Sequence, residues 1–242
     1  MTSIIRPSTS NNNQQKCRWH GYPTSDELEQ DVTRIILNAA SQAINLHQEF
    51  HLVLAGGTTP RSVYERLRAM PADWQAWHIY FGDERCLPAD NAERNSSMAA
   101  TAWLKHVGIP ASHIHTIPAE LGADTAANAY AQTLSKVGIF DLVILGLGED
   151  GHTASLFPEH DWGIKADAPD TLAVFDAPKP PPHRVTLTAK RLNQTRQLMF
   201  LVTGSAKRKA VSDWKNGKNI PASSISPACG IDIYLEETLL LK

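Results

Sequence analysis

Short runs of apolar residues alternate along this chain with segments whose apolar residues recur at the spacing of a helical turn. The runs at 51–55, 77–81, 141–147 and 197–203 are typical of buried strands. Thr24 and Glu27 make a capping box, and the apolar residues after it share one face of a predicted helix that reaches Ala43. The same reasoning predicts further strands at 17–22, 113–117, 172–175, 184–188 and 231–235, and helices at 60–70, 97–106, 125–136 and 206–214.

This alternation predicts an α/β fold, a three-layer sandwich whose mostly parallel central sheet is covered by helices on both faces. Residues 1–16 are rich in Ser, Thr, Asn and Gln and are expected to form a disordered polar tail. We find no internal repeat, and the proline-rich stretch at 178–182 is interpreted as a loop. Residues 17–242 are therefore expected to form a single domain.

The strand predicted at 141–147 runs into a glycine turn that holds Asp150 and His152. Ligands in open α/β sheets bind at the carboxyl ends of the strands, so this acid and this histidine lie where chemistry is expected. A histidine changes charge near neutral pH, and a neighbouring carboxylate can fix its tautomer. The apolar segment that follows is expected to open a helix. The alternative is a surface loop with an incidental histidine.

Gly56, Gly57 and Thr58 follow another predicted strand and precede a helix. Glycines let backbone amides turn toward an anion, and a helix N-terminus adds partial positive charge, so this turn is suited to phosphate. It matches neither of the common nucleotide-binding glycine patterns. A tight turn that needs glycine only for its backbone angles is the alternative.

Charged residues stand at three further element boundaries. Asp83 and Arg85 end the strand at 77–81, while Arg184 and Lys207 lie near the strands at 184–188 and 197–203. Arginine binds phosphate through paired N–H groups and lysine acts as a point charge. Structural ion pairs and solvated surface cations are the alternatives.

Composition narrows the class of protein. Of 242 residues 42% are hydrophobic, and the formal net charge of −2 gives no bulk attraction to nucleic acid or to an anionic membrane. No apolar run is long enough for a membrane helix, and the N-terminal residues lack the apolar region of a signal peptide. Cys17, Cys86 and Cys229 lack metal-ligand spacing and are expected to be free thiols in a reducing cytoplasm. We expect a monomer. We also expect that the protein needs neither a metal nor a cofactor, because no serine-hydrolase elbow, zinc-hydrolase pair or cofactor motif is present.

Taken together, these segments resemble the 6-phosphogluconolactonase family. The matching motifs follow one another in the family's order: Leu54–Pro60, Gly82–Arg85 with Pro88 and Asn95, Gly146–Pro158, Arg184–Thr188 and Gly204–Lys207. The family's usual Ser-Asn before the next helix is Arg94-Asn95 in this chain. The resemblance implies a Rossmann-like fold and hydrolysis of 6-phospho-D-glucono-1,5-lactone to 6-phospho-D-gluconate in the oxidative pentose phosphate pathway.

The resemblance also implies roles for individual residues. His152 is the general base that activates water, and Asp150 orients it. Asp83 contacts sugar hydroxyls. The phosphate and sugar oxygens are held by Gly56, Gly57, Thr58, Arg85, Arg184 and Lys207. A lactone is an activated ester, so one well-placed base and a fixed sugar-phosphate substrate suffice without a metal or a covalent nucleophile.

Two other functions remain open at this point. The sibling amino-sugar-phosphate isomerases and deaminases share the glycine turn and the Asp-Gly-His sequence, but they carry a glutamate where this chain has Phe157 and a tyrosine where it has Arg85. A non-catalytic sugar-phosphate sensor on the same scaffold would keep the phosphate contacts without needing a poised histidine. Such sensors usually carry a DNA-binding domain, for which this chain has neither spare length nor a basic helix.

Overall fold

The computed structural model describes residues 15–241, and its centre is a six-stranded sheet in the order β1-β9-β8-β5-β2-β3. Each pair of neighbouring strands in it is parallel. The strands are β1 Cys17–Tyr22, β2 Phe50–Leu54, β3 Trp77–Phe81, β5 Phe140–Gly146, β8 Thr195–Val202 and β9 Ile231–Glu236. The predicted α/β fold with a mostly parallel central sheet is confirmed.

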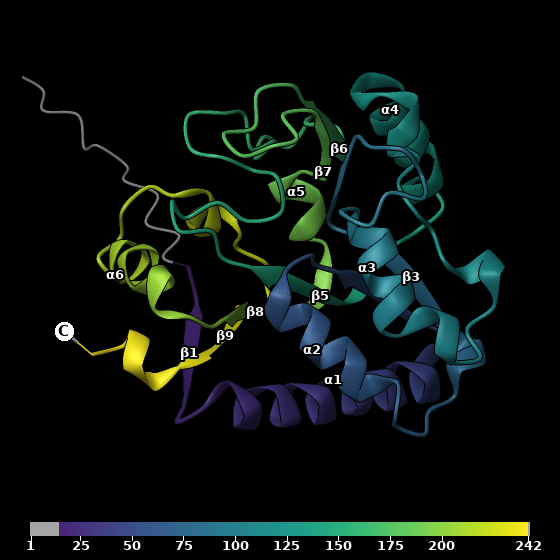
Figure 1. Ribbon diagram of the computed structural model, residues 1–242, viewed down its shortest axis with the longest axis horizontal. Coiled ribbons are helices and arrows are strands. Elements are labelled where there is room, and N and C mark those ends of the chain that lie inside the picture. Colours follow the sequence, from purple (N-terminus) through teal and green to yellow (C-terminus); the bar gives the residue numbers. More distant parts are fainter. Residues whose placement is uncertain (1–14, 242) are drawn as a thin grey trace, which may run out of the picture.

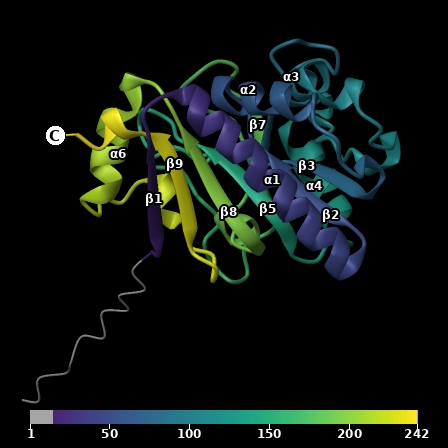
Figure 2. The ribbon, with the colours of Figure 1, turned by 90° about the horizontal axis from the view of Figure 1, so that it is seen from below.

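Helices cover both faces of this sheet. They are α1 Ser25–His47, α2 Thr58–Leu67, α3 Asn95–Ala102, α4 Ala123–Leu134, α5 Ala189–Leu192 and α6 Arg208–Lys215. Figure 2 shows α1 crossing one face of the strands, and Figure 1 shows α4 and α5 on the opposite side of the sheet. Strand β5 is buried along nearly all of its length, as expected for a central parallel strand covered on both faces.

Helix α1 follows its sequence pattern closely. The hydroxyl of Thr24 accepts the backbone N–H of Glu27 at 3.2 Å, which satisfies one of the free amides at the helix start. The carboxylate of Glu27 meets the Thr24 hydroxyl at 3.3 Å, not the Thr24 amide, so one half of the predicted capping box forms. The buried side of the helix consists of Leu28, Val32, Thr33, Ile36, Ala39, Ala40 and Ala43.

The strands predicted near 172–175 and 184–188 form, but they lie in a second, smaller sheet outside the parallel one. Strands β4 (Asp83–Arg85), β7 (Arg184–Leu187) and β6 (Thr171–Val174) form an antiparallel sheet in the order β4-β7-β6. The chain leaves the main sheet at Gly82, whose N–H binds Leu54 and whose carbonyl accepts the amide of Leu187. Because β6 and β7 are antiparallel, the loop at 175–183 joins them directly, whereas a parallel pair would need a longer crossover.

Other local predictions were wrong. The strand expected at 113–117 is a 3-10 turn, Ala111–His113, followed by a single bridge between Ile79 and Ile114. The helix expected after His152 is a turn closed by a bridge between Thr153 and Leu156. In both segments contacts with neighbouring parts of the fold override the local apolar pattern.

The predicted polar tail falls mostly on residues 1–14, which lie outside the described residues. The next residue, Gln15, is bound to the body of the protein: its side chain accepts the indole N–H of Trp214 at 2.6 Å and donates to the carbonyl of Ala222 at 3.0 Å. Gln15 thus contacts the body of the protein, although it falls within the predicted tail. Among residues 15–241, no helix combines the length and the apolar character needed to cross a membrane.

Candidate active site

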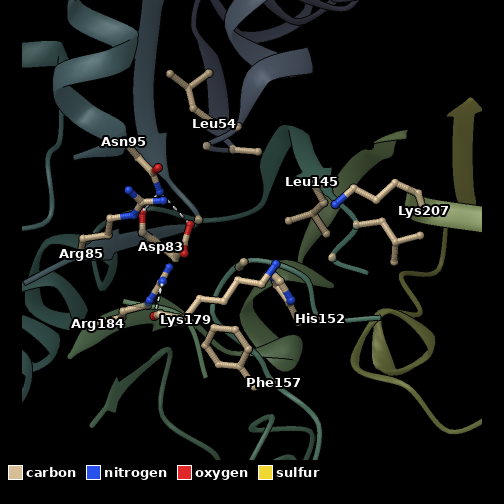
Figure 3. Close-up of a pocket in the computed structure, with 18 of the residues that line it drawn as sticks. Leu54, Asp83, Arg85, Asn95, Leu145, His152, Phe157, Lys179, Arg184 and Lys207 are labelled. Carbon is tan, nitrogen blue, oxygen red and sulfur yellow. Dashed lines mark hydrogen bonds between the residues drawn. The ribbon is translucent and has the colours of Figure 1, made fainter. Parts of the chain in front are cut away.

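The carboxyl ends of four adjacent strands meet at one cavity of about 320 Å³ (Figure 3). Strands β8, β5, β2 and β3 are neighbours in the parallel sheet, so the loops that follow them open on the same edge. Predicted site residues that line the cavity are Gly56, Gly57, Asp83, Arg85, His152, Arg184 and Lys207. Thr58 and Asp150 do not line it: Thr58 follows the lining residue Gly57 in the chain, and Asp150 contacts His152.

His152 is held by Asp150, two residues before it. The Asp150 carboxylate lies 2.5 Å from His152 Nδ1 and accepts the His152 backbone N–H at 3.1 Å. Burial opposes ionisation of Asp150, but the charge and the N–H groups of His152 hold the pKa of this carboxyl below its ordinary value. A carboxylate at Nδ1 keeps the proton on that nitrogen and leaves Nε2 with a free lone pair.

Glycine at position 148 is what lets the His152 ring lie where it does. A Cβ atom on Gly148 would come within 2.0 Å of His152 Nδ1, so any larger residue would displace the ring. The Gly148 amide also donates to the carbonyl of His152 at 2.7 Å, which closes the turn. The glycines of this motif therefore serve the placement of the histidine as well as the path of the chain.

The glycine turn at 55–57 supplies a helix N-terminus to the cavity. Gly57, with φ +109°, is the N-cap residue of α2, and no side chain caps the first turn of this helix. The backbone N–H groups at the helix start are therefore free to donate to a ligand. Thr59 is tied to the end of β8 through its hydroxyl, which lies 2.6 Å from that of Thr203. This bond fixes the glycine turn at 55–57 relative to β8, the strand that leads to Lys207.

Basic side chains surround the cavity. Arg85 and Arg184 stand directly opposite each other in the pairing of β4 with β7, and Lys207 points into the cavity from the side of β8 (Figure 3). Burial lowers the pKa of Arg184, Asp83 opposes this, and the charge of Arg85 lowers it further. Like charges in a cross-strand pair destabilise a sheet, and an anionic ligand would relieve them.

Lys207 experiences a similar repulsion. Burial lowers its pKa, the carboxylate of Glu149 opposes this, and the charge of Lys179 adds to the lowering. Lys179 lines the same cavity and was not predicted from the sequence. The loop that carries it is held by Arg184, whose guanidinium donates to the carbonyls of Lys179, Pro180 and Pro181. The one sequence signal for Lys179 is its position within the proline-rich stretch at 178–182, just before Arg184.

Asp83 and Asn95 form the opposite wall. One Asp83 oxygen accepts the Asn95 amide at 2.9 Å and the other accepts the Ser155 hydroxyl at 2.5 Å. Burial raises the pKa of Asp83, although the Ser155 bond and the charge of Arg184 oppose it. A Cβ atom on Gly56 would lie 2.0 Å from Asn95 Oδ1, so the asparagine packs directly on the glycine turn. Asn95 thus connects this turn with Asp83.

Phe157 also lines the cavity and was not predicted as a site residue from the sequence. Its ring centroid lies 4.9 Å from that of His152, and the guanidinium carbon of Arg184 lies 5.7 Å from it. With Val174 and Ala177 it forms a small hydrophobic cluster apart from the main core. This cluster joins the His152 loop to the β6–β7 hairpin.

Within residues 15–241, no group of three or more His, Cys, Asp or Glu side chains has a geometry that could hold a metal ion. The cavity is lined by a carboxylate-supported histidine, a helix N-terminus and basic side chains. Such a set binds an anionic small molecule and presents one base to it.

Comparison with known proteins places this geometry in context. Residues 23–234 match the model of a family described as glucosamine-6-phosphate isomerases/6-phosphogluconolactonase. A 6-phosphogluconolactonase of Mycobacterium leprae is 35% identical over 220 residues, which cover 85% of this chain and 87% of that protein. A human 6-phosphogluconolactonase is 34% identical over 224 residues, covering 86% of each.

A solved structure agrees with these sequence matches. The crystal structure of 6-phosphogluconolactonase from Thermotoga maritima superimposes with a TM-score of 0.82 at 26% identity, covering 90% of this chain and all (100%) of that one. The similarity therefore extends over the whole α/β fold.

Proposed function

The chain belongs to the family of glucosamine-6-phosphate isomerases and 6-phosphogluconolactonases, and we propose that its site hydrolyses 6-phospho-D-glucono-1,5-lactone to 6-phospho-D-gluconate. This is a carboxylic ester hydrolysis of the oxidative pentose phosphate pathway. The observation that carries the proposal is His152, held at Nδ1 by Asp150, at a cavity lined by Arg85, Arg184 and Lys207.

His152 acts as the general base in this proposal. Its Nε2 takes a proton from a water molecule as the water oxygen bonds to the lactone carbonyl carbon. When the tetrahedral intermediate collapses, the bond from that carbon to the ring oxygen breaks, and His152 returns the proton to the ring oxygen. Asp150 keeps the ring oriented and stabilises the imidazolium that forms between the two steps. The new carboxylic acid then ionises to the carboxylate.

The anchor is divided between backbone and side chains. Phosphate oxygens accept hydrogen bonds from the backbone amides at the start of α2, those of Gly56, Gly57 and Thr58. Positive charge comes from Arg85, Arg184 and Lys207. Asp83 receives sugar hydroxyls with the lone pairs that Ser155 and Asn95 leave free. Lys179, which the sequence did not suggest, joins this set because it faces the same cavity.

The next proposal concerns the oligomeric state of the enzyme and the compartment in which it acts. We propose that the enzyme acts as a monomer in the cytoplasm, since its substrate is a small sugar phosphate and the site is assembled from one chain. Size-exclusion chromatography with light scattering checks the monomer, and a stable dimer at assay concentration would contradict it.

The decisive experiment is a proton-release assay on freshly prepared 6-phosphogluconolactone, with spontaneous opening subtracted. Glucosamine 6-phosphate is assayed in parallel for ammonia release. We expect rapid hydrolysis of the lactone and no deamination. Deamination without lactone hydrolysis would favour the sibling activity, and binding without turnover of either compound would favour a sensor.

A further inference from the structure

We propose that Glu84 and Arg94, a buried ion pair behind the cavity wall, are positioning residues that set Arg85 and Asn95 for catalysis. The inference rests on the proposed function for its activity readout. Neither residue lines the cavity, and both are almost completely buried, with 0% of Glu84 and 2% of Arg94 exposed. A buried charge is costly unless it is paired and hydrogen-bonded, so such a pair needs a structural or functional reason.

The carboxylate of Glu84 binds backbone amides on two elements at once. One oxygen accepts the amides of Arg85 at 2.9 Å and Asn95 at 2.7 Å, and the other accepts the amide of Ser96 at 2.8 Å. Arg94 stands at the N-cap position of α3 but does not cap the helix with its own side chain. Glu84, reaching over from β4, therefore replaces the usual cap and fixes β4 to the start of α3.

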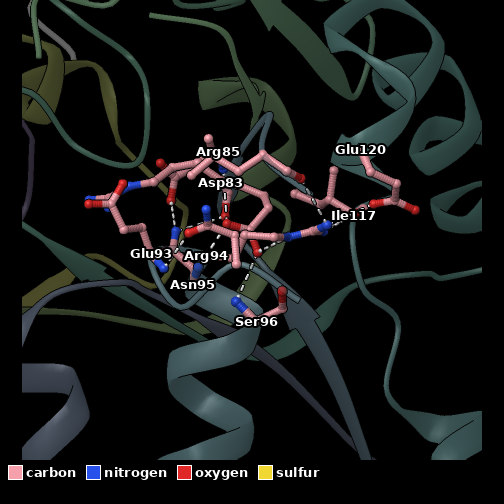
Figure 4. A network of polar contacts seen from close by, with 11 residues as sticks. Asp83, Arg85, Glu93, Arg94, Asn95, Ser96, Ile117 and Glu120 are labelled. Atoms are coloured by element: carbon pink, nitrogen blue, oxygen red, sulfur yellow. Dashed lines mark hydrogen bonds and ion pairs between the residues drawn. The ribbon is translucent and has the colours of Figure 1, made fainter. Parts of the chain in front are cut away.

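Arg94 neutralises this carboxylate and ties it to a third segment. Its Nε lies 3.5 Å from Glu84, while its two terminal nitrogens donate to Glu120 at 2.7 Å and to the Ile117 carbonyl at 2.6 Å. Figure 4 shows Arg94 extending toward Ile117 and Glu120, while Asn95 beside it turns back toward Asp83. The pair thus connects β4, α3 and the 117–120 turn behind one wall of the site.

What the pair holds is functional. The main chain of Arg85 and of Asn95 is bound by the same Glu84 oxygen, and both side chains line the cavity. Asn95 also donates to Asp83 and packs on Gly56 of the glycine turn at 55–57. A shift of Glu84 therefore moves a cation, an amide and the contact with the glycine turn together, and displacements on the order of 1 Å can cost about 100-fold in rate.

The test compares Glu84→Gln, Arg94→Met and their double variant with Arg191→Met. Arg191 is a matched control. It is 1% exposed, its Nε lies 3.6 Å from a carboxylate oxygen of Asp170, and it does not line the cavity. The measurements are the melting temperature, kcat and KM for 6-phosphogluconolactone, and the calorimetric Kd for 6-phosphogluconate. A merely structural role would lower the folded fraction and the apparent kcat but leave KM and Kd unchanged.

We expect Glu84→Gln and Arg94→Met each to lower kcat/KM by about 10- to 100-fold, with a raised KM and a weaker Kd. The double variant should lose less than the product of the two single losses, because it leaves no unpaired buried charge. Arg191→Met should lower the melting temperature while KM and Kd stay at wild-type values. Unchanged KM and Kd in Glu84→Gln, which keeps the shape of the side chain, overturn the inference even if Arg94→Met does not fold.

Failure of the proposed function has a different signature. A wild-type protein that does not hydrolyse the lactone refutes that function, and the positioning role is then decided by calorimetry with inorganic phosphate. Weaker phosphate binding by Glu84→Gln supports it, and equal binding by the two proteins refutes it.

Discussion

Asp150 and His152 are close enough in the sequence for one tight turn to bring their side chains together, and Gly148 leaves room for the ring. The His152 ring lines the cavity that follows β5. At the scale of residues, function depends on a few contacts. The Asp150 carboxylate binds His152 Nδ1, cations surround the cavity, and some of those cations, such as Arg184, already donate hydrogen bonds to the protein. Two predictions belong to these residues.

Replacing His152 by alanine should lower kcat by roughly 10²–10⁴-fold, because the general base is lost while the anchor remains. Binding of 6-phosphogluconate should persist, and calorimetry checks this. His106→Ala is the matched control, since that exposed histidine does not line the cavity and should leave kcat unchanged. Turnover near the wild-type rate in a folded His152→Ala protein would move the base to another residue.

Replacing Lys207 or Arg184 by alanine should weaken binding of the phosphorylated lactone by roughly 10- to 150-fold, the value of a charge-assisted contact of about 1.5–3 kcal/mol. Arg184→Ala should cost more in kcat, because Arg184 also holds the loop that carries Lys179. Steady-state kinetics on 6-phosphogluconolactone and on unphosphorylated gluconolactone measure both effects. Equal losses on the two lactones would mean that these cations do not bind the phosphate.

At the scale of elements, the candidate active site and a pH-sensitive cluster lie at opposite ends of the same strands. The cavity lies at the carboxyl ends of the parallel strands, whereas a group of stacked rings lies at the opposite ends of β2 and β3. His78 stacks on His51 at 4.9 Å and on His113 at 3.9 Å, and its Nδ1 lies 3.4 Å from His115 Nε2. Protonation of more than one of these rings places like charges in contact, so this cluster couples the fold to pH.

The pH dependence follows from His78. Burial, and then the charges of His113 and His51, lower its pKa from 6.5 to about 4 against attraction from Glu49. Between these two values the unfolded chain binds more protons than the folded protein, so the free energy of unfolding falls as pH falls through this window. His78→Phe keeps a stacked ring without a titrating nitrogen and should reduce the fall in melting temperature between pH 6.5 and 4.

Differential scanning calorimetry across this pH range measures the effect. His20→Phe, on β1 away from this cluster, is the control for loss of one histidine. If wild type and His78→Phe lose melting temperature equally, another group governs the acid limb of stability.

At the scale of the whole molecule, the fold brings one base, one anion anchor and one small cavity together, and the proposed chemistry needs no more than these. A lactone is an activated ester, so a strong Lewis acid is not required to polarise it. The site is assembled from both sheets: the main sheet supplies the glycine turn, His152 and Lys207, and the smaller one supplies Arg85 and Arg184.

Exhaustive chelation should therefore leave the rate of 6-phosphogluconolactone hydrolysis unchanged. The assay compares untreated enzyme with enzyme dialysed against chelator and then diluted into metal-free buffer. A loss of activity that one specific divalent ion restores would contradict the metal-free mechanism.

The sequence alone determined the parallel α/β fold, the start of α1 and the glycine turns, because each depends on local periodicity, capping or backbone freedom. It also placed Asp150 beside His152, because only Gly151 separates them. Only the tertiary structure set Arg85 opposite Arg184, bound Lys179 to the cavity and buried Glu84 against Arg94. Arg85 and Arg184 lie far apart in the chain, and strand register and packing, which carry no local signal, decide all three arrangements.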